Sequence, residues 1–369
     1  MGSITPYETS NGKRYRVRYR KPDRSQTDKR GFTTKREAEL FLASVEVSKA
    51  RGEYVDTSAG RITIGELGAE WIQHNHHLKP SSALPLEIAL RLHVLPRWSR
   101  VPVSDVRFSD VQAWVSGIDG GATKVIRAYG VLAAILDTAV RDRRILTNPA
   151  RGVNLPRKVS KEQRYLSHLQ LQTLAQAAGP HETLILLLGY TGLRWGEATG
   201  LRVRDVDHVR RRINISVNAV EVGGEIVVGT PKTHKRRSVA FPAFLSEALS
   251  AGARGKEPDQ LLFSDAAGSH LNRATRGERS WFKSSLVKSG LEPMTLHDLR
   301  HTAASLAISS GANVKAVQRM LGHASAAMTL DVYSNLFDDD LDAVANGLDH
   351  AARQTNVGNL WAKSPTDEA

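Results

Sequence analysis

The C-terminal half of the sequence carries basic and polar residues whose types suit chemistry at a phosphodiester. In chain order they are Arg194 in TGLRWGE, Lys232 in TPKTHKRRSV, His297 and Arg300 in HDLRH, His323 after a glycine, and Tyr333 ten residues further on. The transition state of phosphoryl transfer gathers negative charge on the non-bridging oxygens, which two arginines can clamp bidentately. A tyrosine, with an ordinary pKa of about 10, attacks near neutral pH only beside cations or a base. A lysine can protonate the leaving oxygen, and the basic side chains supply positive charge without a metal.

Each of these residues also has a structural explanation when it is taken alone. HDLRH could be an ion-pair cluster at a helix start, and Lys232 could belong to a solvated basic turn. A single Tyr333 on a helix is more often a packed aromatic. His74, His76 and His77 in IQHNHH raise metal binding, but they have no nearby acidic partner and match no zinc spacing. We therefore expect no metal.

The elements that must position these residues are predicted to form a mainly helical region, residues 165–369, with a small antiparallel sheet. The apolar run LILLLGY predicts a buried helix that ends at Thr191-Gly192 and brings Arg194 to a surface. Alternating Ile213, Ile215 and Val217, then residues 226–228 and 238–241, predict strands, with Lys232 in the turn between two of them. His297 and Arg300 are three apart and share a helical face. The last thirty or so residues predict a helix and a loose tail.

The N-terminal segment, residues 1–60, predicts a small α+β domain. Tyr15, Val17 and Tyr19 alternate with basic residues, which is the two-residue period of a strand with one apolar and one basic face. Gly31-Phe32-Thr33-Thr34 predicts a further strand, and Thr34 with Glu37 predicts a capping box for a helix over 35–49. The candidate DNA contacts on the basic face are Arg14, Arg16, Arg18, Arg20 and Lys21. A solvated edge strand protected by charge is the alternative explanation.

Residues 61–150 predict an all-α domain. Apolar residues share one helical face at 64, 67, 71 and 72, and again at 125, 132, 135, 136 and 139. Pro96, Pro102 and Gly120-Gly121 are predicted to separate the helices. The polar, basic stretch 151–164 is predicted to link this domain to the region that carries Arg194.

Composition narrows the function classes. The chain has 369 residues, so two or three domains are expected, and 41% are hydrophobic, which is enough for real cores. There is no long apolar run and no apolar leader, so we expect neither a membrane span nor secretion. The absence of cysteine excludes disulfides and cysteine nucleophiles. A net charge of +13 favours nucleic acid as the partner of a cytoplasmic protein.

Taken together, TGLRWGE, the lysine turn, HDLRH, LGHAS and LDVYS resemble the catalytic domain of tyrosine site-specific recombinases, over about 200 residues and in the expected order. The helical region resembles the core-binding domain of that family, and the N-terminal segment resembles the arm-binding domain of temperate-phage integrases. The resemblance therefore implies a multidomain protein. Asn335 stands where many relatives have a histidine, at a position that the chemistry does not use.

The resemblance also implies roles for individual residues. Arg194 and Arg300 would hold the scissile phosphate, Lys232 would be the general acid, and Tyr333 would attack. His297 would assist proton transfer and His323 would bond the phosphate. Glu197 would orient Arg194, and His301 would have a supporting role.

The function implied by the resemblance is that of a phage integrase. Such an enzyme cleaves and rejoins double-stranded DNA at core and arm sites through a 3′-phosphotyrosine, without a cofactor. It would act as a homotetramer through a Holliday junction, in the cytoplasm of a bacterial host, with a host DNA-bending protein and an excision directionality factor. Two alternatives are a type IB topoisomerase, which the separate basic N-terminal domain disfavours, and a non-enzymatic DNA-binding regulator, which the intact residue set disfavours.

Overall fold

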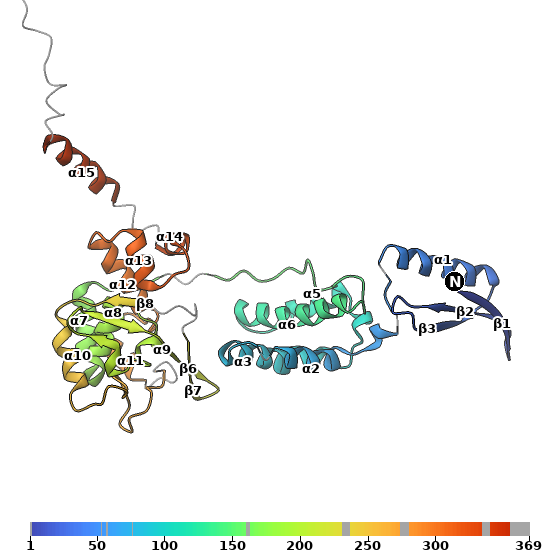
Figure 1. Ribbon diagram of the computed structural model, residues 1–369, viewed down its shortest axis with the longest axis horizontal. Helices are drawn as coiled ribbons and strands as arrows, with labels where there is room; N and C mark the ends of the chain where they lie inside the picture. Colours follow the sequence, from blue (N-terminus) through green and yellow to red (C-terminus); the bar gives the residue numbers. More distant parts are fainter. Residues whose placement is uncertain are drawn as a thin grey trace, which may run out of the picture. The chain divides into compact units, whose positions relative to one another are not determined.

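The computed structural model describes residues 2–52, 54–56, 58–75, 77–159, 163–230, 237–273, 280–333 and 340–354. The chain divides into two compact units, Met1–Ser160 and Lys161–Ala369, and each is described by itself (Figure 1). Each of the three predicted regions contains a hydrophobic core, and the core of the second also includes Val153 of the stretch predicted as a linker, with Leu155 packed against it. The boundaries at residues 60, 150 and 164 remain a prediction. No helix in the described ranges is long and apolar enough to cross a membrane.

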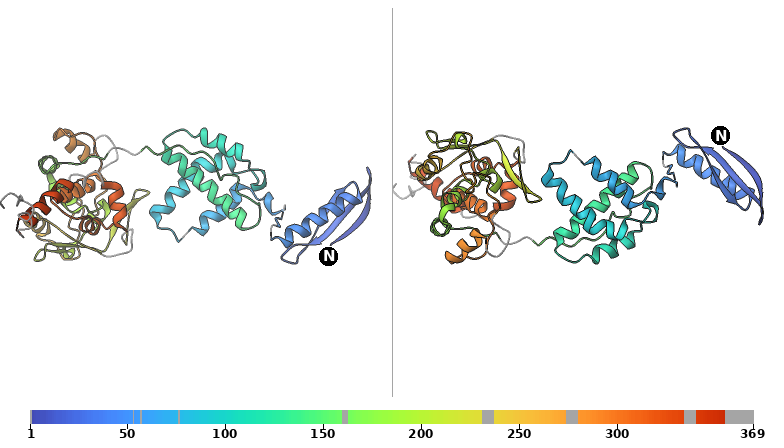
Figure 2. Two further views of the ribbon diagram at one scale, coloured as in Figure 1. Left: turned by 90° about the horizontal axis from the view of Figure 1, so that it is seen from above. Right: turned by 90° about the horizontal axis from the view of Figure 1, so that it is seen from below.

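The N-terminal domain is an antiparallel sheet in the order β1-β2-β3 with one helix packed on it (Figure 2). Its elements are β1 (Ser3–Thr9), β2 (Gly12–Arg20), β3 (Gln26–Phe32) and α1 (Lys35–Ala50). Val17 and Tyr19 on β2 are buried against α1, which confirms the predicted apolar face of this strand. The capping box of α1 is also confirmed, because Thr34 accepts the Glu37 N–H at 3.2 Å and the Glu37 carboxylate accepts the Thr34 N–H at 3.4 Å.

Two strands of this sheet, β3 and β1, differ from the prediction. The strand expected at residues 31–34 is wrong in its bounds, because β3 ends at Phe32 and Thr34 already caps α1. The register shifts at Tyr15/Arg16, and Gly31 is the extra residue there, with a φ of +100° that favours glycine. Strand β1 had no clear pattern of alternation, and it pairs along its whole length with β2.

The second domain is all helical, as predicted. Its elements are η1 (Ala59–Arg61), α2 (Ile64–His74), α3 (Pro80–Ala89), the π-helical turn η2 (Leu90–Val94), α4 (Leu95–Trp98), η3 (Val103–Asp105), α5 (Phe108–Ser116) and α6 (Ala122–Arg141). The predicted apolar faces of α2 and α6 are confirmed, since Ile64, Leu67 and Leu132 are at most 1% exposed. The prediction that Pro96 separates helices is wrong: it lies in the first turn of α4, directly after the π-helical turn. The wider turn accommodates a ring that would clash with the carbonyl four residues earlier in a regular helix.

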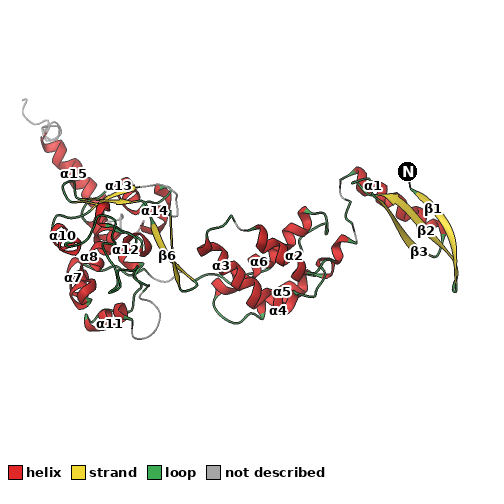
Figure 3. Ribbon diagram, turned by 60° about the horizontal axis from the view of Figure 1, so that its bottom comes forward, coloured by secondary structure: helices red, strands yellow, loops and turns green. Residues whose placement is uncertain are grey.

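The third region is mainly helical with small antiparallel sheets (Figure 3). Its helices are α7 (His168–Ala177), η4 (Gly179–His181), α8 (Glu182–Thr191), α9 (Trp195–Ala198), η5 (Val203–Asp205), α10 (Leu245–Ala253), α11 (Trp281–Lys288), α12 (Asp298–Ser309), α13 (Val314–Leu321), α14 (Ala326–Tyr333) and α15 (Asp340–Gln354). Its strands are β4 (Val206–Asp207), β5 (Arg212–Ile215), β6 (Asn218–Val222), β7 (Glu225–Gly229) and β8 (Arg237–Ala240).

The strands of this region form two sheets where the sequence predicted one. The first has the order β4-β5-β8, and the second is the β6–β7 hairpin. The alternation of Ile213 and Ile215 holds in β5, and both side chains are buried. Val217 does not continue that strand, because the chain leaves the first sheet after Ile215 and begins the hairpin at Asn218.

Candidate active site

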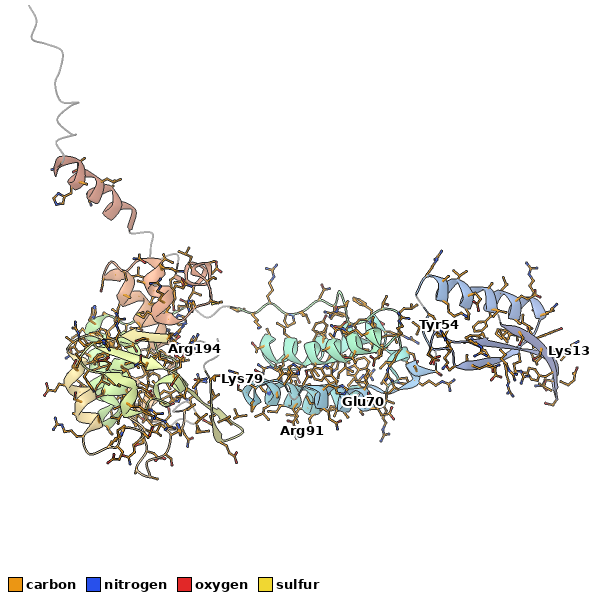
Figure 4. All side chains as sticks on the ribbon, viewed as in Figure 1. Lys13, Tyr54, Glu70, Lys79, Arg91 and Arg194 are labelled. Atoms are coloured by element: carbon orange, nitrogen blue, oxygen red, sulfur yellow. The ribbon has the colours of Figure 1, made fainter. Side chains whose placement is uncertain are left out.

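Arg194 lies just after the end of a buried helix, as the sequence predicted. Helix α8 is buried along most of its length, and Gly192 ends it in the left-handed conformation with a φ of +64°. A Cβ at Gly192 would lie 2.6 Å from a methyl carbon of Leu321, so glycine is required there by space as well as by φ. Two residues later Arg194 directly precedes α9, and its side chain is labelled in Figure 4. That side chain is 27% exposed.

Glu197, one turn into α9, accepts four hydrogen bonds although its side chain is only 1% exposed. Arg194 donates its backbone N–H and its Nη1–H to the two carboxylate oxygens, at 2.9 Å each. Arg237 on β8 donates Nη1–H at 2.8 Å and Nη2–H at 2.6 Å. Burial opposes ionisation of Glu197, but these bonds, those of Arg237 first, hold its pKa below the ordinary value.

Arg300 on α12 forms hydrogen bonds with two loops of the site. Its side chain is 3% exposed, and it donates Nη1–H to the carbonyl of Gly192 at 2.5 Å and Nη2–H to the carbonyl of Leu321 at 2.7 Å. Three of the five guanidinium N–H donors are left for other acceptors. Burial, followed by the charge of Arg194, lowers the pKa of Arg300 to about 9, so it is still cationic at neutral pH.

Tyr333, the last residue of α14, is buried with its hydroxyl beside a histidine. It is 2% exposed and packs in a small apolar cluster that includes Ala304, Ile308 and Leu321. Nδ1 of His301 lies 2.8 Å from the Tyr333 hydroxyl, a distance at which either group can donate. Burial raises the pKa of Tyr333 to about 12 against the opposing charge of Arg300, and burial lowers the pKa of His301.

The other two predicted histidines, His297 and His323, also have lowered pKa values. His297 directly precedes α12, and its ring meets the His301 ring edge-on with centroids 5.0 Å apart. Burial, and then the neighbouring His301, lower the pKa of His297 to about 4. His323 follows Gly322, which ends α13 with a φ of +66°, and its Nδ1 lies 3.0 Å from the hydroxyl of the buried Thr329. Burial and the charge of Arg300 lower the pKa of His323 to about 4.

The structure thus brings the described members of the predicted set into one region. Arg194 and His297 line a pocket of about 250 Å³, together with Trp195, Asn218 and Arg273. Arg300 joins the loops that carry Arg194 and His323. Lys232 and Asn335 lie outside the described residues. The described part of the chain has no group of three or more metal-ligating side chains, and His76 lies outside it.

Comparison with known proteins identifies the segment that carries this site. Residues 164–339 match the phage integrase family, and every predicted catalytic residue falls inside that stretch. The match covers somewhat less than half of the chain, and it identifies this segment as a phage integrase domain. The integrase of Mycobacterium phage D29 is 28% identical over 320 residues, which is 82% of this chain and 84% of the phage protein. The integrase of Mycobacterium phage L5 is 27% identical over 308 residues, covering 80% of this chain and 81% of that integrase.

Solved structures of integrases share the fold. The Tn1549 transposon integrase in complex with a circular intermediate DNA matches with a TM-score of 0.66 and 23% identity, over 78% of this chain and 99% of that chain. The lambda integrase tetramer bound to a Holliday junction matches with a TM-score of 0.58 and 17% identity, over 87% of this chain and 95% of that chain.

Sequence reasoning missed one residue of this site and underrated another. Arg237 was seen only as part of a basic turn, yet it is the strongest partner of Glu197. The only signal was a pair of arginines before a predicted strand, which does not reveal a partner forty positions away. His301 was predicted to have a supporting role, whereas its Nδ1 lies within hydrogen-bond distance of the Tyr333 hydroxyl.

The predicted DNA-binding strand of the first unit presents its basic residues unequally. Arg18 and Arg20 are exposed, while Arg14 and Arg16 are half-buried, and Arg16 donates to Thr5 at 3.3 Å. Lys21 differs from them because its ammonium is paired with Asp56, which raises the pKa of the lysine. A DNA phosphate at Lys21 would compete with that carboxylate. DNA contact by this strand stays a prediction.

Proposed function

We propose that the chain is a site-specific DNA recombinase that integrates and excises a mobile element through a phosphotyrosine at Tyr333. One observation carries the proposal: Arg194 and Arg237, paired with the buried Glu197, and the buried Arg300 gather in one region with a tyrosine whose hydroxyl contacts a histidine of lowered pKa. The arginines supply charge for a phosphate, and the histidine supplies an acceptor for the tyrosine proton.

In the proposed cleavage step the Tyr333 oxygen bonds to the scissile phosphorus and its proton passes to Nδ1 of His301. The bond from phosphorus to the 5′ oxygen breaks, and Lys232 protonates that oxygen. Arg194 and Arg300 offset the charge on the non-bridging oxygens, and His323 donates to one of them. Ligation is the reverse reaction with the 5′ hydroxyl of a partner duplex. The bond energy is conserved, so no nucleotide cofactor enters.

The burial of Tyr333 adds a requirement to this mechanism. A side chain only 2% exposed cannot present its oxygen to a phosphate held at Arg194 unless α14 moves, and the movement must keep the hydroxyl within hydrogen-bond distance of Nδ1 of His301 for the proton transfer. Its raised pKa keeps the phenol protonated and unreactive until then. Assembly on DNA would supply the energy for that movement, so cleavage would be coupled to assembly.

The proposed partner is double-stranded DNA, bound as a homotetramer at core sites. The charge of +13 and the lambda integrase tetramer on a Holliday junction support this assembly. The exposed arginines of β2 would hold separate arm sites and so raise the effective concentration of distant DNA segments. A host DNA-bending protein and a directionality factor would complete the complex, in the cytoplasm of a bacterial host.

The test is a suicide substrate, a nicked duplex that carries a candidate attachment core, incubated with EDTA and read on a denaturing gel. The wild-type chain should form a covalent adduct, and Tyr333→Phe should bind the DNA but form none. Tyr165→Phe is the matched control, because Tyr165 packs on the same cluster and its hydroxyl donates to Gln163. An adduct that survives Tyr333→Phe would refute the proposal. Tight binding without any wild-type adduct would favour a non-enzymatic regulator.

A further inference from the structure

We infer that Arg237 is a positioning residue that neutralises Glu197 and so keeps the charge of Arg194 available to the scissile phosphate. The inference rests on the proposed function and adds to it a residue outside the predicted catalytic set. Arg237 begins β8, whereas Arg194 and Glu197 belong to the start of α9.

The hydrogen bonds around Glu197 are divided unequally between the two arginines. Arg237 bonds both carboxylate oxygens with its two terminal nitrogens, at 2.8 and 2.6 Å. The Arg194 guanidinium bonds one oxygen, through Nη1 at 2.9 Å. The guanidinium of Arg237 therefore forms a bidentate pair with the carboxylate, whereas the guanidinium of Arg194 bonds it through one nitrogen.

The charges in this cluster explain why that division matters. With both arginines present, one carboxylate is shared by two cations, and a net positive charge is left beside Arg300. Without Arg237, a carboxylate that is 1% exposed would have Arg194 as its only cationic partner among its described contacts. A buried charge needs a counter-charge, so Glu197 would draw Arg194 into a bidentate pair. The guanidinium would then be turned away from the phosphate and largely neutralised.

Arg237 also reaches the turn that carries His323. A Cβ added to Gly322 would lie 2.8 Å from Nε of Arg237 and 3.0 Å from its Cζ, so the guanidinium occupies the space where a side chain at position 322 would begin. Nε is buried and has no acceptor among the described residues. Since an unpaired buried N–H is unfavourable, the side chain is held there by Glu197 and by packing rather than by full hydrogen bonding.

The experiment is a double-mutant cycle on the rate of adduct formation, measured in single turnover at saturating suicide substrate. Arg237→Gln alone should slow cleavage about 10- to 100-fold, the range for losing hydrogen bonds to a charged group. In the Glu197→Gln background the same substitution should have almost no effect, because no charge is left to neutralise. DNA affinity should change little in either background.

Arg212→Gln is the matched control, since Arg212 lies exposed on β5 of the same sheet and its loss removes the same charge. Arg237→Lys keeps the charge with one contact and should fall between wild type and Arg237→Gln. If Arg237→Gln does not fold, the cycle is run with Arg237→Lys.

Two results would overturn the inference while the proposed function stands. One is a wild-type cleavage rate for Arg237→Gln. The other is an equal loss in the wild-type and Glu197→Gln backgrounds, which would show that Arg237 acts through something other than Glu197. A wild-type chain that forms no adduct would instead refute the proposed function itself, and the inference with it.

Discussion

Replacing His301 with alanine should slow formation of the Tyr333 adduct by about 100-fold at neutral pH, the lower end of what a positioned base contributes. The expectation follows from the 2.8 Å contact between Nδ1 of His301 and the tyrosine hydroxyl. Burial lowers the pKa of His301, so near pH 7 the ring is neutral and can accept the proton.

The magnitude can be related to the cost of ionising the tyrosine without a base. Burial raises the pKa of Tyr333 to about 12. At about 1.4 kcal/mol for each pH unit, removing its proton to solvent at pH 7 costs about 7 kcal/mol. A base that takes the proton during attack avoids part of this cost. The variant must rely on the small fraction of tyrosinate present before attack.

The pH dependence separates these two routes. The wild-type rate should be nearly constant from about pH 7 to pH 8, because His301 is already neutral there and Arg300, with a pKa of about 9, is still mostly cationic. The rate of His301→Ala should rise about tenfold for each pH unit over the same interval, since the tyrosinate fraction increases towards a pKa near 12. A substrate with a 5′-bridging sulfur isolates this step, because the thiolate leaves without needing a proton.

The control is a second histidine–tyrosine pair in the same unit, in which Nδ1 of His168 lies 2.9 Å from the Tyr190 hydroxyl. His168→Ala should leave both the rate and its pH profile unchanged. A His301→Ala variant with the wild-type rate and a flat profile would refute the reasoning. The contact with Tyr333 would then serve packing alone.

Three further predictions follow from the described contacts. Gly322→Ala should destabilise the chain by about 1–3 kcal/mol in urea unfolding, because its φ is +66° and a Cβ would meet Arg237; an unchanged midpoint would contradict this. Replacing Arg18 and Arg20 with glutamine should lower the slope of log affinity against log salt for arm-site DNA by about 2, and an unaltered slope would exclude phosphate contacts there. His297 and His323 have pKa values near 4 in the folded chain and bind protons more readily when it is unfolded, so the free energy of unfolding should fall as the pH falls from about 6.5 to about 4. Replacing both with glutamine should make this fall smaller in urea titrations, and a fall as large as that of the wild type would mean that other groups cause it.

Local patterns in the sequence predicted the elements that carry the site. The apolar run before Gly192, the alternation in β2 and the capping box at Thr34 are signals contained in ten residues or fewer, and the structure confirms them. Errors occurred where a neighbour in space changes the local rule. Gly31 is a bulge only because β2 and β3 pair around it, and Pro96 stays helical only because a π-turn precedes it.

The site residues show the same division. The predicted set was found by its order and spacing, and the structure brings its described members together. The contacts that set their chemistry join residues far apart in the chain, such as Arg300 with Gly192 and His301 with Tyr333. No pattern within one segment specifies such a pair. The roles of the predicted residues therefore still depend on the adduct assays.

The charge distribution of the site gives a physical reason for its order of assembly. Arg194 and Arg237 share Glu197 as a carboxylate partner, and burial with repulsion from these arginines lowers the pKa of Arg300 to about 9. A phosphate would relieve that repulsion, so its binding is favoured before any movement of the nucleophile. Tyr333 has the opposite preference, because it is buried and protonated beside His301. In the proposed mechanism the cationic half of the site is therefore ready to bind DNA while Tyr333 is withheld, which would allow assembly on DNA to precede cleavage.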